Sequence, residues 1–195
     1  PLVPVLCMFA ATAVLGAARR VPRLPARWCV AALLSLIAIV PPLHAALAYG
    51  RILRHADTRV EANEFVQRSL PPGTQVATYG PPIVWDSTFP SLQVVHCVKS
   101  DQEQWMEVLR RAKDQNVDYF LTHHSPLQVF SPDIPDLEAA LRRSATQIAE
   151  FDFADRSAGS APAPVYDVVD GFYVPIGGFR GVKRPGPLVR LYRLN

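Results

Sequence analysis

The chain has 195 residues, of which 49% are hydrophobic and 19% are charged, and this composition excludes a disordered tail. Its 19 prolines exclude a long-helix or coiled-coil protein. The net charge of +3 is unevenly spread: residues 1–50 hold four arginines and no acid or lysine, whereas residues 51–195 hold the remaining bases and all 17 acids. The larger part is nearly neutral, which argues against a nucleic-acid partner.

The number and positions of the cysteines argue against a disulfide in the polar region and against a zinc site. Cys7 and Cys29 lie in apolar segments, which leaves Cys97 as the only thiol of the polar region, so no disulfide can form within that region. A zinc site needs more ligands at closer spacing. We therefore expect no metal site in this chain.

Two uncharged apolar runs occupy residues 1–18 and 28–49. About 18 to 20 residues are needed for a helix to cross a hydrocarbon core of roughly 30 Å. Trp28 and Tyr49, at the two ends of the second run, suit the two interfaces of a bilayer. The pattern predicts a transmembrane helical hairpin over the first 50 residues.

A buried hairpin in a soluble protein is the alternative. Pro41-Pro42 inside the second run favours it, since proline removes a backbone hydrogen bond and kinks a helix. Kinked membrane spans are tolerated where neighbouring helices cover the break. A secretory signal peptide does not fit, because its positive charge precedes the apolar stretch, whereas here the arginines follow it.

The arginines also predict an orientation. Cytoplasmic loops retain Lys and Arg, and the connector between the runs holds Arg19, Arg20, Arg23 and Arg27. We therefore expect the connector in the cytoplasm, the chain in the inner (plasma) membrane as a multi-pass protein, and residues 51–195 outside the cytoplasm.

The polar region predicts helices that alternate with strands. Capping boxes, Thr58 with Glu61 and Ser100 with Glu103, mark two helix starts. Helices are expected at residues 58–70, 100–112 and 136–143, and strands at 75–79, 92–98, 117–121, 149–153, 166–174 and 188–194. The last two strands are expected to be antiparallel and joined by a turn at Gly177-Gly178. This order predicts the α/β class, with residues 51–195 folded as an α/β sandwich with a mixed sheet.

Several side chains are pocket candidates. His123 and His124 follow a predicted strand at the end where open α/β sheets bind ligands. A metal or acid–base role with His96 is conceivable, but adjacent residues of an extended chain point to opposite faces, which favours strand-end hydrogen bonding. In a predicted loop, Trp85 and Asp86 could contact a sugar, although an exposed polar face is the default interpretation.

Arg51, Arg54 and His55 lie just beyond the second apolar run. Their position suits the phosphate of a lipid-linked donor at the interface, because guanidinium groups bind phosphate in a fork. Side chains that only anchor the helix end are the simpler interpretation. No nucleophile elbow or phosphate loop occurs, so no catalytic residue is assigned.

The order of these parts resembles the C-terminal end of bacterial polyprenyl-phosphate-sugar-dependent glycosyltransferases. These belong to the integral-membrane GT-C group, akin to protein O-mannosyltransferases and the aminoarabinose transferase of lipid A. The resemblance covers nearly the whole chain. It rests on the final hairpin, on Asp57-Thr58-Arg59, on the run from Tyr166 to Phe179, and on the Arg-Pro-Gly-Pro ending at residues 184–187.

The resemblance implies transfer of a sugar from a polyprenyl-phosphate donor to an extracytoplasmic acceptor. In that group the catalytic base lies in an early extracytoplasmic loop, and some members need a divalent cation; neither that loop nor its acidic motif is present in this sequence. The chain begins at Pro1 inside an apolar run, so we expect the C-terminal piece of a longer protein, inactive alone. Its partners would then be membrane lipid, the donor and the N-terminal transmembrane region of the same protein.

Two other functions remain open from the sequence. One is a non-enzymatic, membrane-anchored extracytoplasmic binding or sensor module. The other is an independent soluble α/β enzyme, which the lack of a nucleophile motif or cofactor loop disfavours.

Overall fold

The computed structural model describes residues 3–79, 92–97, 99–100, 103–127, 134–160, 162–168 and 173–195. Contacts divide the chain into two compact units, Pro1–Gly50 and Arg51–Asn195. Trp85 and Asp86 lie outside the described residues.

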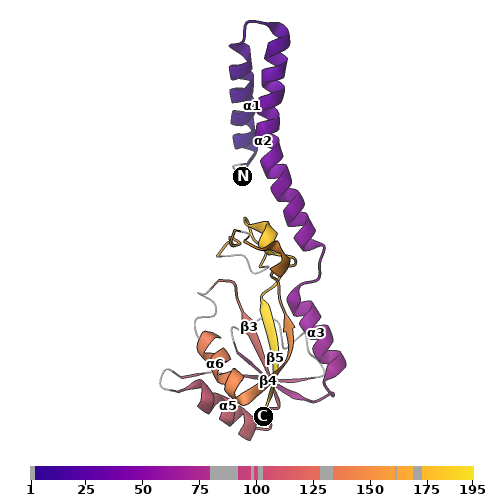
Figure 1. Cartoon of the computed structure of the whole chain (residues 1–195), viewed down its shortest axis with the longest axis vertical. Helices are drawn as coiled ribbons and strands as arrows, with labels where there is room; N and C mark the ends of the chain where they lie inside the picture. The colour runs from indigo at the N-terminus through magenta and orange to yellow at the C-terminus, as the bar shows by residue number, and fades with distance from the viewer. Residues whose placement is uncertain are drawn as a thin grey trace. The chain divides into compact units, whose positions relative to one another are not determined.

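The first unit consists of two helices (Figure 1), α1 (Val3–Arg19) and α2 (Leu24–Leu53), and α2 continues three residues into the second unit. The connector is shorter than expected, because residues 20–23 alone lie outside the helices. Pro25 is the second residue of α2, where the missing N–H has no intrahelical acceptor to lose. Helix α2 also runs through Pro41 and Pro42 without a break in its assignment.

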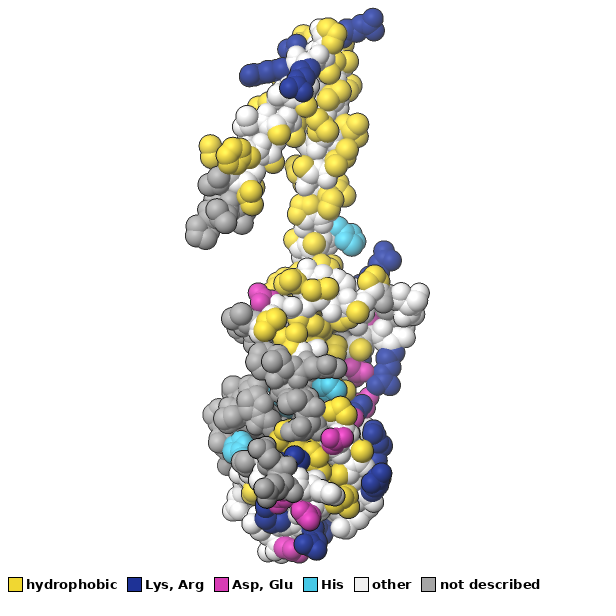
Figure 2. Space-filling model, turned by 90° about the vertical axis from the view of Figure 1, so that its left-hand side faces the viewer, with side chains coloured by type: hydrophobic (Ala, Val, Ile, Leu, Met, Phe, Trp, Pro, Cys, Tyr) yellow, Lys and Arg dark blue, Asp and Glu magenta, His cyan; other side chains and the backbone are white. Residues whose placement is uncertain are grey.

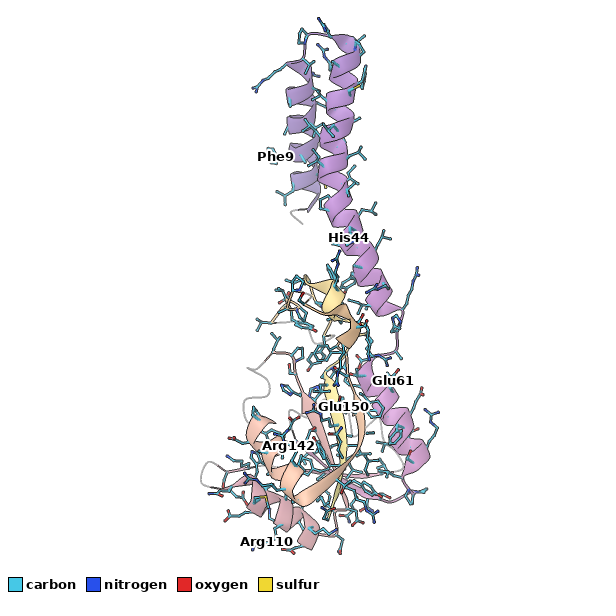
Figure 3. The ribbon with its side chains drawn as sticks, viewed as in Figure 1. Phe9, His44, Glu61, Arg110, Arg142 and Glu150 are labelled. Carbon is cyan, nitrogen blue, oxygen red and sulfur yellow. The ribbon has the colours of Figure 1, made fainter. Side chains whose placement is uncertain are left out.

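The apolar side chains of the first unit are exposed. Among residues 6–50, Ala18 alone is buried, and Met8, Phe9 and Trp28 are 69–71% exposed. Phe9 points away from α2 in Figure 3, and Figure 2 shows hydrophobic side chains along both helices with the arginines at their connecting end. A helix that is apolar on all sides requires an apolar environment.

One helical stretch of the described residues, Leu24–Ser69, is long and apolar enough to cross a membrane, with an 18-residue window of mean hydropathy 2.1. It contains α2. Helix α1 is apolar but shorter, at 17 residues. The apolar helix predicted near the N-terminus is therefore present.

The second unit is built on a mixed sheet, as predicted. Its strands are β1 (Gln75–Tyr79), β2 (Gln93–His96), β3 (Tyr119–His124), β4 (Ala145–Phe151) and β5 (Leu188–Leu194), in the order β2-β1-β3-β5-β4. Strands β2, β1 and β3 are parallel, and β5 is antiparallel to both β3 and β4. The sequence therefore predicts the class and the kind of sheet correctly.

Helices cover both faces of this sheet (Figure 1). Helices α5 (Trp105–Asp114) and α6 (Ile134–Ser144) pack on one face, where Val108, Phe120 and Leu137 belong to one buried cluster. Helix α3 (Thr58–Ser69) packs on the other face, where Val66 and Leu191 belong to a second cluster. Burying each such aliphatic side chain stabilises the fold by about 1.5–3 kcal/mol.

Two local expectations about helix starts are wrong. Asp57, not Thr58, caps α3: its side chain accepts the Arg59 N–H at 2.8 Å, while the Thr58 hydroxyl donates to the Pro187 carbonyl at 2.6 Å. Helix α5 begins at Trp105 with Gln104 as its cap, four residues after Ser100. In both places a neighbouring polar residue, Asp57 or Gln104, directly precedes the helix and is its N-cap.

The predicted strand at residues 166–174 is also wrong for the residues that the structure describes. Val165 and Gly177 form a single isolated bridge, and Val168 lies in a turn. Tyr173 has φ +55°, a left-handed conformation that a strand residue does not adopt. Residues 162–168 and 173–183 therefore form an irregular loop cluster, with no named strand among them.

This loop cluster has a small core of its own. Ile52, in the last turn of α2, is fully buried against Val174 and Val182, with Phe153 and Phe179 at the margin. Two short 3-10 helices, η2 (Arg156–Ala158) and η3 (Phe179–Gly181), complete the cluster. The loop cluster is therefore fastened to the end of α2.

Candidate functional site

The candidate site lies at the carboxyl ends of the neighbouring parallel strands β1 and β3. From β1 the chain passes to β2 on one side, and from β3 it passes through α6 to β4 on the other side. In open α/β sheets, ligands commonly bind beside the carboxyl ends of the strands at such a reversal. His123, His124 and Ser125 lie at this edge.

His123 and His124 face opposite sides of the sheet, as strand alternation requires. The ring of His123 contacts the Tyr173 ring edge to face, with centroids 5.7 Å apart. Burial lowers the pKa of His123, the charge of Arg59 lowers it further, and the charge of Asp57 raises it. Burial lowers the pKa of His124, the charge of Glu138 of α6 raises it, and the charge of Arg190 of β5 lowers it. The two imidazoles therefore belong to separate environments and do not form one site.

On the α3 side, two segments far apart in the sequence are joined. The Thr58 N–H donates to the Pro185 carbonyl at 3.1 Å, and the Thr58 hydroxyl donates to the Pro187 carbonyl. Gly186 has φ +106°, and a Cβ at this position would collide with Thr58 Oγ1 and Asp57 Oδ1. Close approach of the two backbones thus requires glycine.

Arg59 and Tyr173 lie beside His123. Arg59 binds Asp57 through two side-chain hydrogen bonds, of 2.9 Å from Nε and 2.7 Å from Nη2, and its guanidinium lies 5.2 Å from the centre of the Tyr173 ring. The side chains of Tyr173 and Ser125 share a hydrogen bond. Burial raises the pKa of Tyr173 above its ordinary value, although the charge of Arg59 opposes this.

His123 is neutral at physiological pH. Burial lowers its pKa to about 4, and the positive charge of Arg59 adds to the effect; the residue is 3% exposed. A general base works best with a pKa near the operating pH. His123 is thus better suited to hydrogen bonding as a neutral side chain than to proton transfer at pH 7.

On the α6 side, ion pairs link four elements. Arg190 of β5 bonds Glu138 of α6 and also Glu150 of β4, the latter at 2.8 Å from Nε, and Arg156 of η2 bonds Glu150 at 2.5 Å. Burial would raise the pKa of Glu150, but the hydrogen bond and charge of Arg190 outweigh it and hold the pKa below its ordinary value. Glu150 lies beside the sheet in Figure 3.

The other predicted residues lie apart from these two environments. His96 is on β2, separated from β3 by β1, and its Nδ1 is 3.2 Å from Thr78 Oγ1. Arg51, Arg54 and His55 are exposed, and His55 Nδ1 donates to the Arg51 carbonyl at 3.0 Å. Within the described residues, no group of three or more His, Cys, Asp or Glu side chains is placed to hold a metal ion.

Sequence reasoning missed Arg59, Ser125 and Tyr173. The motif Asp57-Thr58-Arg59 and the Arg-Pro-Gly-Pro ending lie far apart in the sequence, yet the structure brings them together through Thr58 and Gly186. A glycine between two prolines, which excludes helix and strand alike, is the signal of a close approach. Nothing in the sequence signalled the left-handed Tyr173.

The arrangement combines a buried neutral histidine with paired charged side chains. No family model, curated protein or solved structure matches the chain.

Proposed function

We propose that this chain supplies two membrane spans and an extracytoplasmic α/β domain to a polyprenyl-phosphate-sugar-dependent glycosyltransferase. The domain would bind or position the acceptor and support the membrane region, while the catalytic base would lie elsewhere in the enzyme. The sequence resemblance motivates the reaction class.

A single structural observation carries the proposal. The sheet edge that holds His123 also receives the chain that has just left α2: Thr58, five residues beyond α2, bonds Pro185 and Pro187, and β5 begins at Leu188, the partner of His124. Only a few residues of chain therefore separate the end of α2 from Thr58, which bonds the segment before β5. A lipid-linked donor would also be met near the end of a membrane span, because its phosphate lies at the interface.

The first two helices support the membrane part of the proposal. Their side chains are apolar and exposed, with arginines at the connector. We propose that both α1 and α2 cross the bilayer, with the connector in the cytoplasm. A divalent cation, if the reaction needs one, would bind outside this chain.

Arg51 and Arg54 are the proposed contacts to the donor phosphate, with His55 beside them. All three are exposed at the end of α2. Guanidinium groups bind phosphate oxygens in pairs, which makes the two arginines the stronger candidates.

The test measures sugar transfer by the transferase that contains this chain. The enzyme is assayed in native membranes supplied with radiolabelled polyprenyl-phosphate sugars. Arg51→Gln with Arg54→Gln should raise KM for the lipid donor, whereas Tyr173→Phe should raise KM for the acceptor with little change in kcat. Arg68→Gln, on the exposed face of α3, is the matched control. Absence of transfer from every polyprenyl-phosphate sugar would contradict the proposal.

A further inference from the structure

The loop cluster at residues 152–183 exposes aliphatic side chains that its own core does not use. Val165, Val168 and Ile176 are 56%, 59% and 63% exposed. Val165 and Ile176 are adjacent, because the Ile176 N–H donates to the Val165 carbonyl at 2.7 Å, and Val168 follows three residues later in a turn. We call these three residues the aliphatic patch.

We propose that the aliphatic patch inserts into the phospholipid interface, so that the α/β domain rests on the bilayer through its loop cluster. This inference rests on the proposed membrane insertion of α2. The occupant is lipid, and the reasons lie in the attachment of the cluster and in its charges.

The attachment comes from Ile52. This side chain is 0% exposed and packs on Val174 and Val182, which places the loop cluster against the last turn of α2. The uncharged run of α2 ends at Gly50, two residues earlier. With α2 in the bilayer up to Gly50, as proposed, a segment that packs on Ile52 would lie close to the headgroups.

The patch itself is fixed in position. Gly178 has φ +68°, and a Cβ there would collide with the backbone of Ala163 and Pro164, so the two arms of the loop touch. The Val165 N–H donates to the Gly177 carbonyl at 3.0 Å. Aliphatic side chains held outward on such a closed loop require no ordering when they enter an apolar phase.

The charges around the cluster fit phospholipid headgroups. Arg51, Arg54, Arg180 and Lys183 are exposed. Hydrogen bonds from Ser157 lower the pKa of Asp155 most, and the charges of Arg51 and Lys183 lower it further. Asp167 is a further acid on these loops, so the surface is only moderately basic. Long basic side chains beside an apolar patch can reach headgroup phosphates while the patch enters the acyl boundary.

The experiment uses the full chain with its three cysteines changed to serine, reconstituted in vesicles of phosphatidylethanolamine and phosphatidylglycerol. An environment-sensitive NBD label is attached at Ile176→Cys. The control label is at Gln115→Cys, an exposed position at the opposite end of the sheet, beside the C-terminal end of α5. Brominated lipids then report direct contact with acyl chains.

The proposal predicts blue-shifted emission and quenching by brominated lipid at position 176, and neither at position 115. The double change Val165→Ser and Val168→Ser should abolish quenching at position 176 without releasing the chain from the vesicles. Emission at position 176 like that at position 115, in a chain that resists carbonate extraction, would overturn this inference and leave the proposed function standing.

Two further results would be decisive. A blue shift at position 176 without quenching would show that protein, not lipid, covers the patch, and would overturn the inference. A chain that carbonate removes from the vesicles would overturn the proposed function together with this inference.

Discussion

The two units of the chain differ in the burial of their apolar side chains. In residues 6–50 aliphatic and aromatic groups are exposed and Ala18 alone is buried, whereas in Arg51–Asn195 the large aliphatic groups fill clusters on both faces of a sheet. Folding in water is driven by removal of apolar surface from the solvent. The second unit satisfies that requirement internally, whereas the described part of the first unit leaves its apolar side chains exposed.

The largest effect is expected where the second unit closes on itself. Gly186→Ala should lower the free energy of unfolding by about 3–5 kcal/mol, because the backbone is left-handed and the new Cβ collides with Thr58. Gly73→Ala is the matched control: φ is +81°, but nothing lies within 4 Å of a Cβ, so only about 1–2 kcal/mol is lost. Urea unfolding in detergent measures both. Equal losses would show that the contact with Thr58 is not tight.

The next largest effect tests the first unit. Ile37→Asp places a charge near the middle of α2, on a side chain that is 61% exposed, and should weaken membrane insertion by about 3 kcal/mol. Val60→Asp, at a 48% exposed position on α3, should change membrane association little. The carbonate-resistant fraction of each variant measures insertion. Retention of Ile37→Asp at the level of the parent would argue that α2 is not in lipid.

His123 should make the second unit depend on pH. Its folded pKa of about 4 lies below the ordinary value of 6.5, so the unfolded chain binds the proton first as the pH falls. The free energy of unfolding should therefore decrease between pH 6.5 and pH 4, by about 2–3 kcal/mol from this group. The His123→Gln variant should lose that part of the pH dependence. Identical pH profiles for the two proteins would contradict the burial of a neutral imidazole.

The smallest effect is expected for Arg59, which lies beside His123. Arg59→Lys removes the two-bond pairing with Asp57 and the stacking on Tyr173, and should cost about 1–2 kcal/mol of stability. Arg68→Lys alters an exposed pair with Glu64, whose side chains are 74% and 62% exposed, and should change stability by less than about 0.5 kcal/mol. Equal effects of the two changes on urea unfolding would show that Arg59 is held no more firmly than a surface residue.

The sequence predicts the repeating parts of this protein well, because periodic burial leaves a periodic pattern. Leu137, Ala140 and Leu141 show the spacing of α6, and all three are buried. His123 and His124 were placed at a strand end by the short apolar run before them, and β3 does end at His124.

The irregular parts could not be predicted in the same way. Tyr173 adopts a left-handed backbone within a segment whose alternating pattern is typical of a strand. Thr58 and Pro185 are hydrogen-bonded although they lie far apart in the sequence, and no local spacing encodes such a contact. The candidate site consists mostly of contacts of this kind, which explains why its histidines were identified and its arginine and tyrosine were missed.

We propose that the first unit lies in a membrane with the second unit outside the cytoplasm. This topology is tested most directly by single cysteines at Ser157 and Arg23, in a chain without its native cysteines, exposed to an impermeant thiol reagent in intact spheroplasts. The proposed topology predicts labelling at position 157 and none at position 23. Labelling at position 23 alone would contradict it.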